Sequence, residues 1–505
     1  MKKLFTLLFV AVAAVAARAT DYNVPITVTV NGATSEQTGV ISVVENGGLY
    51  ELTVKNFMLQ SEEGPLPVGN VELKGIKPYQ DGNATLLLTK QDVTITKGDD
   101  PNVLYWMADM LSEVPVPVDL RGKIVNGTLR CYLDINLETL GQVIQVAIGD
   151  DNGYQMPNPS FEDWHTSTGS YQEPNAWHSF ESAAGSLAAL AGHHIEKSNV
   201  AHSGDVSARI YATSIFGFVA NGTMTTGRMN AASMSAADSK GNYAYLDMSM
   251  TDKDGNGDPF YTPLYSRPDA LSVWVKFKQE TANASHPYAT ISAAITDGTR
   301  YQDPEDKEYT NVVAKAKNNT IATTNGEWKE IVIPFEYTDN AVDPKAVLVT
   351  ISTNADAGQG SDKDEMLVDD IAFIYNAKVT GMKIKGQDVT GFNADKTDYE
   401  MELNEAITAD DIEVAVEGKP HVVKNVEEKD GEYICTIDVI GSDMKAKSTY
   451  VVKVKSNATA ISSMKPAAAQ TATYYTLDGR QVYTLTPGNT YISRQADGTT
   501  IKIRR

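Results

Sequence analysis

The sequence has little of several features that would narrow its function. Among its 505 residues there are only two cysteines, which excludes a fold held together by a disulfide framework. Histidines are also few, at seven. Basic residues are also scarce: 43 Lys and Arg stand against 65 Asp and Glu, and the formal net charge is −22. Because an acidic chain repels nucleic acid and anionic lipid, we expect neither as a partner.

Long apolar runs are missing after the first residues of the chain. Met1-Lys2-Lys3 is followed by an apolar run from Leu4 to Ala17 and by small residues up to Ala19. This order is typical of a secretory signal peptide, which we place at 1–19. The run is shorter than the roughly 20 residues that span a membrane. We therefore expect an exported protein without a membrane span, at the cell surface or outside the cell, with the periplasm as the alternative.

Catalytic signatures are missing as well. The sequence has no Gly-x-Ser-x-Gly elbow, His-Glu-x-x-His motif or phosphate-binding loop. No spacing among its many acids singles out the carboxylate pair that glycoside hydrolysis needs. We therefore expect binding and assign no catalytic residue. Cys131 and Cys435 each fall on the apolar phase of an alternating strand, which predicts two buried thiols in separate domains.

Alternation of apolar and polar residues runs through most of the chain and predicts an all-β, multidomain fold. The first unit shows many short strand patterns and one helical stretch, at 103–111. Such a series of strands predicts a closed barrel, since closure removes exposed sheet edges. The predicted units are 20–150, 158–376 and 377–456, then a linker at 457–473 and a small C-terminal β-unit at 474–505.

The second unit carries a resemblance at both of its ends. Asn158-Pro-Ser-Phe-Glu-Asp-Trp164 opens it, and Leu367-Val-Asp-Asp-Ile-Ala-Phe-Ile-Tyr375 closes it. Between them lie His202-Ser-Gly204 and the alternating segment Leu271-Ser-Val-Trp-Val-Lys-Phe277. Together these segments resemble the putative carbohydrate metabolism domain, a family of jelly-roll β-sandwiches similar to carbohydrate-binding modules. The resemblance implies a jelly roll and a connection with sugars.

The first and third units resemble other secreted β-domains. Residues 20–150 resemble calycin-like β-barrels, which often hold an apolar ligand, although small barrels are more often filled by their own side chains. In the third unit, Phe392 and Tyr399 bracket a turn-rich loop, and the closing strand is Tyr450-Val-Val-Lys-Val454. This pattern resembles cadherin-like or immunoglobulin-like sandwiches, which usually act as spacers.

The tail resembles the sorting domain that the type IX secretion system reads. Asp478-Gly-Arg480 and Pro487-Gly488 supply its turns, Tyr491-Ile492 lies in a strand, and the chain ends in a basic strand. The resemblance implies export machinery as a partner. A small structural cap without an export role is the alternative.

The jelly-roll resemblance also implies a structural Ca²⁺ between the first and last strands of that unit. Glu162, Asp369 and Asp370 occupy the matching positions. Asp369 shares its strand phase with Ile371 and Phe373, so we expect it to point inward, where a metal would neutralise its charge. The alternative is that these carboxylates accept hydrogen bonds from loop amides.

A second loop has the composition of a calcium site. Asp252, Asp254, Asn256 and Asp258 follow the Asp-x-Asp-x-Asn-Gly pattern that begins a calcium loop. Pro263 stands where the pattern needs a glutamate. Because Asp, Asn and Gly also favour tight turns, we expect a hairpin turn and keep calcium as the alternative.

Three polar stripes on predicted strands of the jelly roll are candidates for sugar binding. The C–H faces of a pyranose stack on aromatic rings while nearby polar groups bond its hydroxyls. If the three strands are neighbours, the stripes form one aromatic and charged face. A tryptophan in a sandwich strand is also often part of the core. The candidate glycan ligands are Arg209, Tyr211, Tyr243, Tyr245, Asp247, Trp274 and Lys276.

These patterns predict a secreted or cell-surface protein that binds a glycan through its jelly roll without catalysing a reaction. Two alternatives remain open: a glycoside hydrolase or lyase with its acids on the jelly-roll face, and an adhesin or structural surface protein that binds no sugar. A deep cleft with two facing carboxylates would favour the enzyme. A flat face with an exposed Trp274 would favour the binder, and a jelly roll without exposed aromatics the adhesin.

Overall fold

The chain folds almost entirely into β-strands, which confirms the all-β, multidomain prediction. Neither of its two described helices, each of four residues, has the length and apolar character to cross a membrane. Residues 1–17 of the predicted signal peptide and 457–472 of the predicted linker lie outside the described residues. The computed structural model describes residues 18–61, 64–111, 115–137, 141–253, 255–403, 405–456, 473–482, 484–494 and 499–504.

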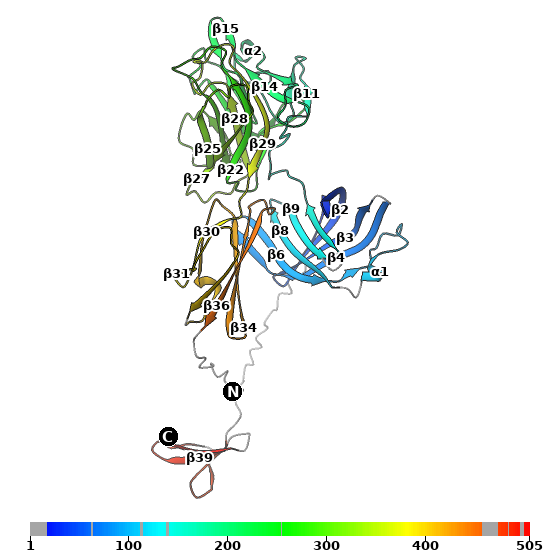
Figure 1. Cartoon of the computed structure of the whole chain (residues 1–505), viewed down its shortest axis with the longest axis vertical. Coiled ribbons are helices and arrows are strands. Elements are labelled where there is room, and N and C mark those ends of the chain that lie inside the picture. The colour runs from blue at the N-terminus through cyan, green and yellow to red at the C-terminus, as the bar shows by residue number, and fades with distance from the viewer. Residues whose placement is uncertain are drawn as a thin grey trace, which may run out of the picture.

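The first unit is one curved sheet of ten strands (Figure 1). In sheet order the strands are β5 (Pro78–Asp81), β6 (Ala84–Val93), β8 (Val116–Val125), β9 (Thr128–Leu137), β10 (Gln142–Ile148), β1 (Arg18–Val30), β2 (Ala33–Asn46), β3 (Leu49–Ser61), β4 (Gly64–Ile76) and β7 (Ile95–Thr96). Among the described residues the end strands β5 and β7 do not pair with each other. The expected closed barrel is therefore corrected to a half barrel, since end strands of four and two residues offer few hydrogen bonds for closure.

The concave side of the half barrel is packed with its own apolar side chains. Alternate residues of its long strands, such as Ile26 and Val28 of β1, are buried in one core that also takes in Trp106. The indole lies against Gly98, where an added Cβ would come within 2.4 Å of it. Because Trp106 is inserted in this way, the chain before α1 (Ala108–Leu111) is irregular, and the predicted helix at 103–111 is reduced to its last turn.

The second unit is a sandwich of two antiparallel sheets around a separate core. One sheet has five strands, in the order β13 (Ile195–Ser198), β14 (Ser207–Tyr211), β29 (Glu365–Ile374), β22 (Ala270–Lys278) and β26 (Lys329–Pro334). The other has six, in the order β17 (Thr223–Thr225), β28 (Ala346–Ser352), β23 (Ala289–Thr296), β25 (Val312–Ile321) and β27 (Glu336–Tyr337), with β21 (Thr262–Pro263) also on β28. Inward residues alternate with outward ones along both sheets, so each sheet has one outer face.

Short elements extend the sandwich at one end, where Figure 1 labels β15 and α2. They are the hairpins β11 (Trp164–Thr166) with β12 (Gln172–Pro174) and β15 (Thr213–Ile215) with β16 (Phe218–Ala220), the 3₁₀ turn η2 (Phe180–Ser182), the helix α2 (Ala188–Ala191), and a small sheet of β18 (Arg228–Ala231), β19 (Asn242–Thr251), β20 (Pro259–Phe260) and β24 (Tyr301–Asp303). These elements carry the walls of the cavity described below.

The third unit is a smaller sandwich with its own core. Its sheets are β31 (Gln387–Asp388), β30 (Val379–Ile384) and β33 (Ile412–Val416) against β32 (Asp398–Leu403), β36 (Lys447–Ser456), β35 (Glu432–Ile440) and β34 (His421–Lys429), with the 3₁₀ turn η3 at Ala409–Asp411. Cys435 is buried in this core and Cys131 in that of the half barrel, and both thiols are free, as predicted.

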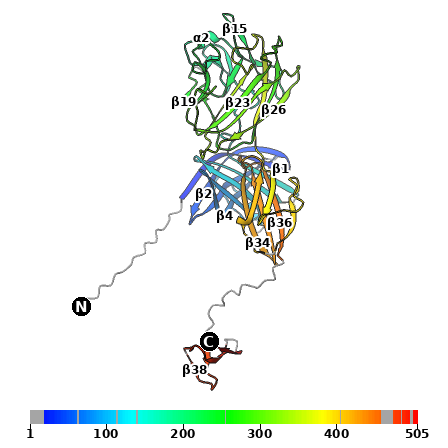
Figure 2. The same ribbon diagram turned by 90° about the vertical axis from the view of Figure 1, so that its left-hand side faces the viewer.

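The third unit packs beside the half barrel, and both ribbon views show them next to each other (Figure 2). Ile440 and Met444 join Leu86 and Val125 of the half barrel in one apolar cluster. Lys123 is buried at this junction and donates to the carbonyl oxygens of Ser442 (3.2 Å) and of Tyr265 in the jelly roll (2.9 Å). A buried ammonium must be satisfied in this way, so all three units share one contact region.

The tail forms a four-stranded sheet in the order β38 (Gln481–Val482), β37 (Thr473–Tyr475), β39 (Thr490–Arg494) and β40 (Thr500–Arg504). Gly479 and Gly488 have positive φ angles of 85° and 88°, as the predicted turns require. The small C-terminal β-unit is therefore present.

Candidate functional site

The three predicted sugar-binding stripes do not form one face. Trp274 and Lys276 lie on β22 of the five-stranded sheet, where β29 separates them from Arg209 and Tyr211 on β14. The third stripe lies on β19, in the small sheet with β18, β20 and β24. The condition for a single aromatic face, that the three strands be neighbours, is therefore not met; alternation identifies the polar side of a strand but not its neighbours.

Trp274 is partly buried and in contact with other side chains of the protein. Its indole stacks on the His202 ring with centroids 3.7 Å apart and 14° between the planes. His202 Nδ1 in turn lies 2.5 Å from an Asp370 carboxylate oxygen, and Trp328 meets the same imidazole edge-on. One face of the indole is thus covered by the protein itself, which removes it as a stacking platform on that side.

The other predicted stripes are also engaged in internal contacts. Arg209 bonds Glu196 (2.5 Å) and Glu365 (2.5 and 2.8 Å), and its guanidinium lies 4.8 Å from the Tyr211 ring centroid. On β19, Tyr245 is buried under Arg300. Asp247 accepts from the backbone and hydroxyl of Ser249 and lies 3.9 Å from Arg300, while Tyr243 alone lines the cavity described next.

The predicted calcium carboxylates near the jelly-roll ends hold the loop at 202–206. Asp369 is fully buried, as predicted, and accepts from the amides of His202 (2.7 Å), Ser203 (3.4 Å) and Asp370 (2.9 Å). Glu162 accepts from two further amides of the same loop, and Asp370 from the Ser203 hydroxyl. Burial raises the pKa of Asp369. These bonds match the alternative in which the carboxylates accept hydrogen bonds from loop amides. Calcium binding here stays a prediction.

The acidic loop after β19 is a hairpin turn, as expected. The Asp252 amide donates to the carbonyl oxygen of Asp258 across it, the Gly257 amide donates to the carbonyl oxygen of Asp252, and the returning strand begins at Pro259. Asp258 accepts from Asn256 and from the amide of Ala176, so it holds the turn to a neighbouring loop. Asp254 lies outside the described residues. Calcium at this turn also stays a prediction.

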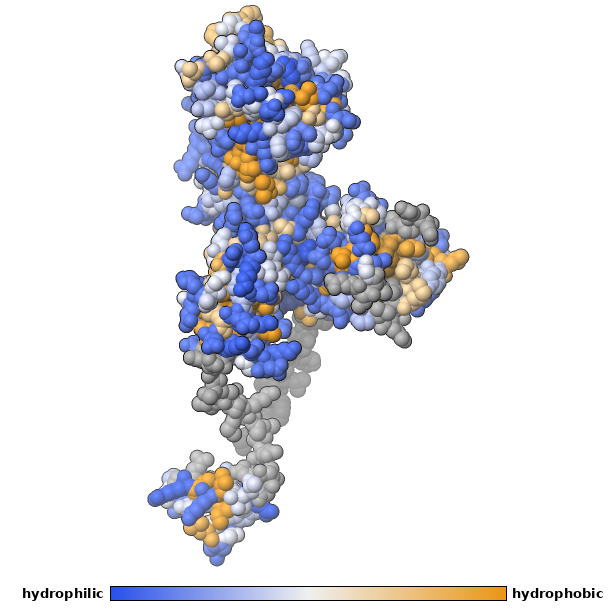
Figure 3. Space-filling view, in the orientation of Figure 1, coloured by the Kyte–Doolittle hydropathy of each residue, from blue (hydrophilic) through white to orange (hydrophobic). Residues whose placement is uncertain are grey.

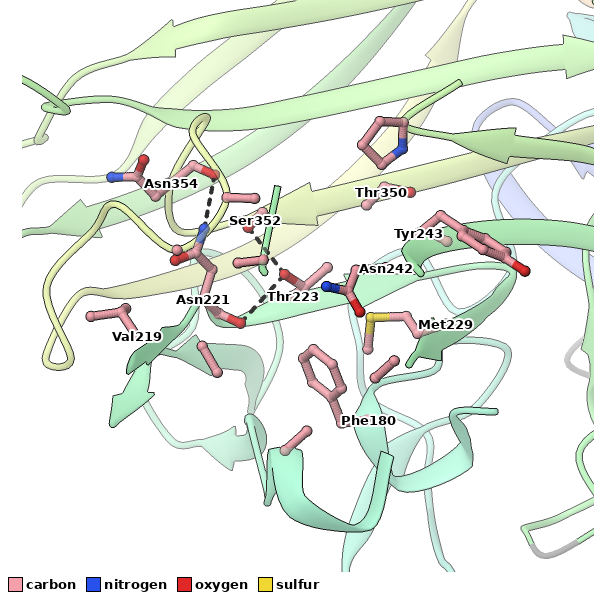
Figure 4. A pocket seen from close by; sticks show the side chains of 18 of the residues that line it. Phe180, Val219, Asn221, Thr223, Met229, Asn242, Tyr243, Thr350, Ser352 and Asn354 are labelled. Atoms are coloured by element: carbon pink, nitrogen blue, oxygen red, sulfur yellow. Dashed lines mark hydrogen bonds between the residues drawn. The ribbon is translucent and has the colours of Figure 1, made fainter. Parts of the chain in front are cut away.

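A cavity of about 290 Å³ lies over the outer face of the six-stranded sheet (Figure 4). Its floor consists of polar side chains that alternate with core residues along four adjacent strands, β17, β28, β23 and β25. Thr223, Ser352 and Thr290 form one cross-strand row, and Thr350, Ser292 and Lys317 form the next. Two rows of hydroxyl groups and one ammonium therefore face the same space.

The floor residues keep hydrogen-bonding capacity for a ligand. Thr223 donates to Ser352 (3.0 Å), and Thr290 donates to Asn319 (2.7 Å). A hydroxyl has one donor and two acceptor lone pairs, so each can still bond a guest. Ser292 donates to Asp303 (2.5 Å), and Lys317 Nζ lies 3.9 Å from the same carboxylate. Asp303 is the only acid among the described lining residues.

The walls are apolar and partly exposed. Leu190, Phe216, Phe218 and Met234 line the cavity although between 49% and 79% of each side chain's surface is open to solvent. Figure 4 shows Phe180 and Met229 across the cavity from Thr350 and Ser352. In the view of Figure 3 most of the surface is hydrophilic and apolar patches are scattered. A group of exposed large apolar side chains around a polar floor is typical of a ligand site.

Phe216 is held in an unusual backbone conformation. It lies with Gly217 in the two-residue turn between β15 and β16, at φ angles of 50° and 82°. Two positive φ angles match the type I′ turn of tight hairpins. A phenylalanine with positive φ is uncommon and costs free energy, and this one lies on the cavity rim.

The sequence contained a signal for the floor but none for the rim. Thr290 and Ser292, like Thr350 and Ser352, alternate with buried residues in the same way as the Trp274 stripe. They contain no aromatic residue, so the sequence pattern does not distinguish them from any other half-exposed strand. Phe216 and Phe218 flank a Gly in a short turn, and only the fold brings them over the sheet.

Comparison with known proteins leaves the function open. No protein-family model matches the chain, and no curated protein is significantly similar to it. One similar solved structure is a putative glycoside hydrolase from Bacteroides thetaiotaomicron: 12% identity, 69% of this chain and 83% of that chain covered, TM-score 0.30. Another comes from work on the promiscuous specificity of carbohydrate-binding modules of the β-sandwich superfamily. It shows 8% identity, covers 69% of this chain and 97% of that chain, and has a TM-score of 0.20. Likenesses with TM-scores below 0.5 support no functional conclusion.

Proposed function

We propose that the protein binds a glycan or glycoconjugate in the cavity over the six-stranded sheet and does not catalyse its cleavage. The observation that carries the proposal is the pairing of hydroxyl rows on β17, β28 and β23 with the exposed Phe216 and Phe218. Sugar hydroxyls would bond the floor, and the C–H face of a pyranose would stack on a phenyl ring. A purely apolar ligand would leave the floor unsatisfied.

The single acid of the cavity supports binding over hydrolysis. Cleavage of a glycosidic bond by the usual route needs two carboxyl groups on either side of the bond. Asp303 is bonded to Ser292 and lies near Lys317, and it has no second acid opposite it among the described lining residues. A glycoside hydrolase or lyase is the second candidate, and an adhesin without a sugar site the third.

The test is a glycan array probed with the labelled full chain, followed by incubation of each bound glycan with the unlabelled chain and analysis for released products. We expect retention of a chemically related set of glycans and no product. A chain that releases shorter sugars is an enzyme. If the chain retains no glycan at all, the result favours the third candidate, an adhesin without a sugar site.

We also propose export to the cell surface or medium, with the C-terminal β-unit contacting the export machinery. The N-terminal pattern at 1–19 and the turns of the tail support this location. Deletion of 474–505 should then strand the chain in the periplasm. Surface or medium levels equal to those of the full chain would identify the tail as a cap.

A further inference from the structure

A buried cluster of two histidines and two carboxylates lies where the β11–β12 hairpin meets the turn after β19. His165 comes from β11, Glu173 from β12, His178 from the segment that follows, and Asp252 from the start of the turn. Ligand atoms of His165, Glu173 and Asp252 lie within 4.8 Å of one another. His178 Nδ1 lies 3.8 Å from an oxygen of Asp252. Three side chains able to bind a metal therefore converge, and a fourth, His178, lies beside one of them.

Both imidazoles are oriented so that an unprotonated nitrogen faces the cluster. His165 Nδ1 lies 3.1 Å from Asn175 Oδ1, and Asn256 donates to the same oxygen, which identifies it as an acceptor. His165 Nδ1 therefore carries the proton, and Nε2 is left with its lone pair. His178 Nε2 donates to the carbonyl oxygen of Pro259 at 3.2 Å, so Nδ1 keeps the lone pair. Such outer hydrogen bonds are the usual way in which proteins orient metal-binding histidines.

Three ligand atoms of this cluster, one each from His165, His178 and Glu173, have no hydrogen-bond partner among the described residues. In the described structure His165 Nε2, His178 Nδ1 and Glu173 Oε2 are buried without a hydrogen-bond partner. His178 and Glu173 are fully buried residues. Buried polar atoms nearly always have a partner, so three such atoms in one cluster indicate that a ligand binds there.

The two carboxylates need a positive charge. Glu173 accepts from the amide and hydroxyl of Ser179 through Oε1 (2.8 and 2.7 Å), and Asp252 accepts from the Gly255 amide at 3.1 Å. Two buried anions beside neutral imidazoles are costly, and a divalent cation would cancel both charges.

We propose that His165 Nε2, Glu173 Oε2, His178 Nδ1 and the Asp252 carboxylate form a structural site for a divalent transition-metal ion of the zinc class. Two imidazoles with two carboxylates suit such ions, whereas Ca²⁺ takes six to eight oxygen ligands. All four ligands come from the protein and the cluster is buried, as in closed structural sites. This metal site differs from both calcium predictions in its ligands and in its ion.

The metal would hold one wall of the glycan cavity from behind. Phe180, which lines the cavity, begins η2 directly after Ser179, and Ser179 bonds the Glu173 ligand. The β11–β12 hairpin and the turn after β19 would be joined through the ion. Metal binding is measured without any glycan, so a chain that binds zinc but no sugar would overturn only the proposed function.

The first experiment uses the full chain purified without chelator. Elemental analysis should find a single zinc-class ion per chain, and removal of the ion should lower the melting temperature until Zn²⁺ is returned. Co²⁺ in place of Zn²⁺ should give visible absorption bands of a low-coordinate site. A chain that holds no metal and whose melting is indifferent to Zn²⁺, Co²⁺, Ni²⁺ and Mn²⁺ overturns the proposal. So does a chain that responds to Ca²⁺ alone.

The second experiment assigns the ligands by titrating Zn²⁺ into the apo form of each variant. Glu173→Gln keeps the side-chain shape and should weaken binding by about 10-fold or more, as should His165→Asn, by comparison with the loss seen when supporting groups of metal sites are removed. The matched control is His286→Asn, because His286 pairs with Asp356 in a different loop. Unchanged binding in both ligand variants overturns the assignment. If a ligand variant fails to fold, the metal content and cobalt spectrum of the natural chain decide.

Discussion

The two outer faces of the jelly roll both carry polar side chains but differ in whether open space lies over them. On the five-stranded sheet, Trp274 is stacked on His202 and Arg209 is bonded to two glutamates. On the six-stranded sheet, threonine and serine rows face an open cavity, and Phe216 is 79% exposed above them. The side chains of the first face are engaged with one another, whereas the floor hydroxyls of the second keep hydrogen-bonding capacity next to an open cavity.

The difference teaches that residue type alone does not identify a binding face. A tryptophan beside a lysine looks like a sugar platform in the sequence, yet the fold places an imidazole on that indole. Threonine and serine look neutral, yet three strands align them into two rows. What marks a site is unsatisfied capacity combined with exposed apolar area.

Filling the cavity should have the largest effect on binding. Thr350 lies in the middle of the floor and alternates with the core residues Val349 and Ile351. Thr350→Trp would place an indole in the space meant for the ligand and should abolish glycan retention, while the melting temperature changes little. Isothermal titration of the full chain checks this. Affinity equal to that of the natural chain would show that the glycan binds elsewhere.

Removal of the aromatic rim of the cavity, Phe216 and Phe218, should have the next largest effect on glycan binding. Phe216→Ala and Phe218→Ala should each weaken glycan binding by about 1–2 kcal/mol, the usual cost of losing an aromatic contact at a binding site. Stability should be nearly unchanged because both rings are exposed. The matched control is Tyr105→Ala, an exposed aromatic on the half barrel. If the double variant Phe216→Ala/Phe218→Ala binds glycan as tightly as the control, the two phenyl rings have no stacking role.

Trp274→Ala should show the opposite pattern to the rim variants. Loss of the stack on His202 should cost about 1–2 kcal/mol of the free energy of unfolding, less than for a fully buried indole. Glycan affinity should not change. Urea unfolding and titration on the same preparation separate the two quantities. A Trp274→Ala chain that keeps its stability and loses glycan binding would restore the sequence-based prediction.

The smallest effect is expected for Arg209→Met. The Arg209 side chain is 30% exposed, and its two glutamate partners are similarly exposed or more so. Such pairs contribute about 1 kcal/mol or less and are screened by salt. Unfolding measured at low and high ionic strength should show a small difference that shrinks with salt. A loss of sugar binding in this variant would mean that the five-stranded face takes part after all.

Local structure was more predictable from the sequence than spatial neighbourhood. Alternation identified the strands that became β1, β22 and β29, the buried cysteines and the inward Asp369, because period two is a local property. It did not reveal that β29 lies between β14 and β22, or that β19 belongs to another sheet. Strand order depends on contacts between distant segments, which one sequence does not display.

The same limit explains what was missed at the sites. The four residues of the proposed metal site are spread from β11 to the turn after β19, with no spacing typical of a metal motif. In the sequence Asp252 belongs to a pattern typical of a calcium loop. Only the folded chain shows it beside His165 and Glu173.

The most direct test of the central claim is to locate the ligand. Crystals of the full chain soaked with a glycan selected on the array should show the sugar over Thr350 and Ser352, with one ring face against Phe216 or Phe218. Density for the sugar over Trp274 and Lys276 on the five-stranded sheet, with the cavity holding none, would contradict the account.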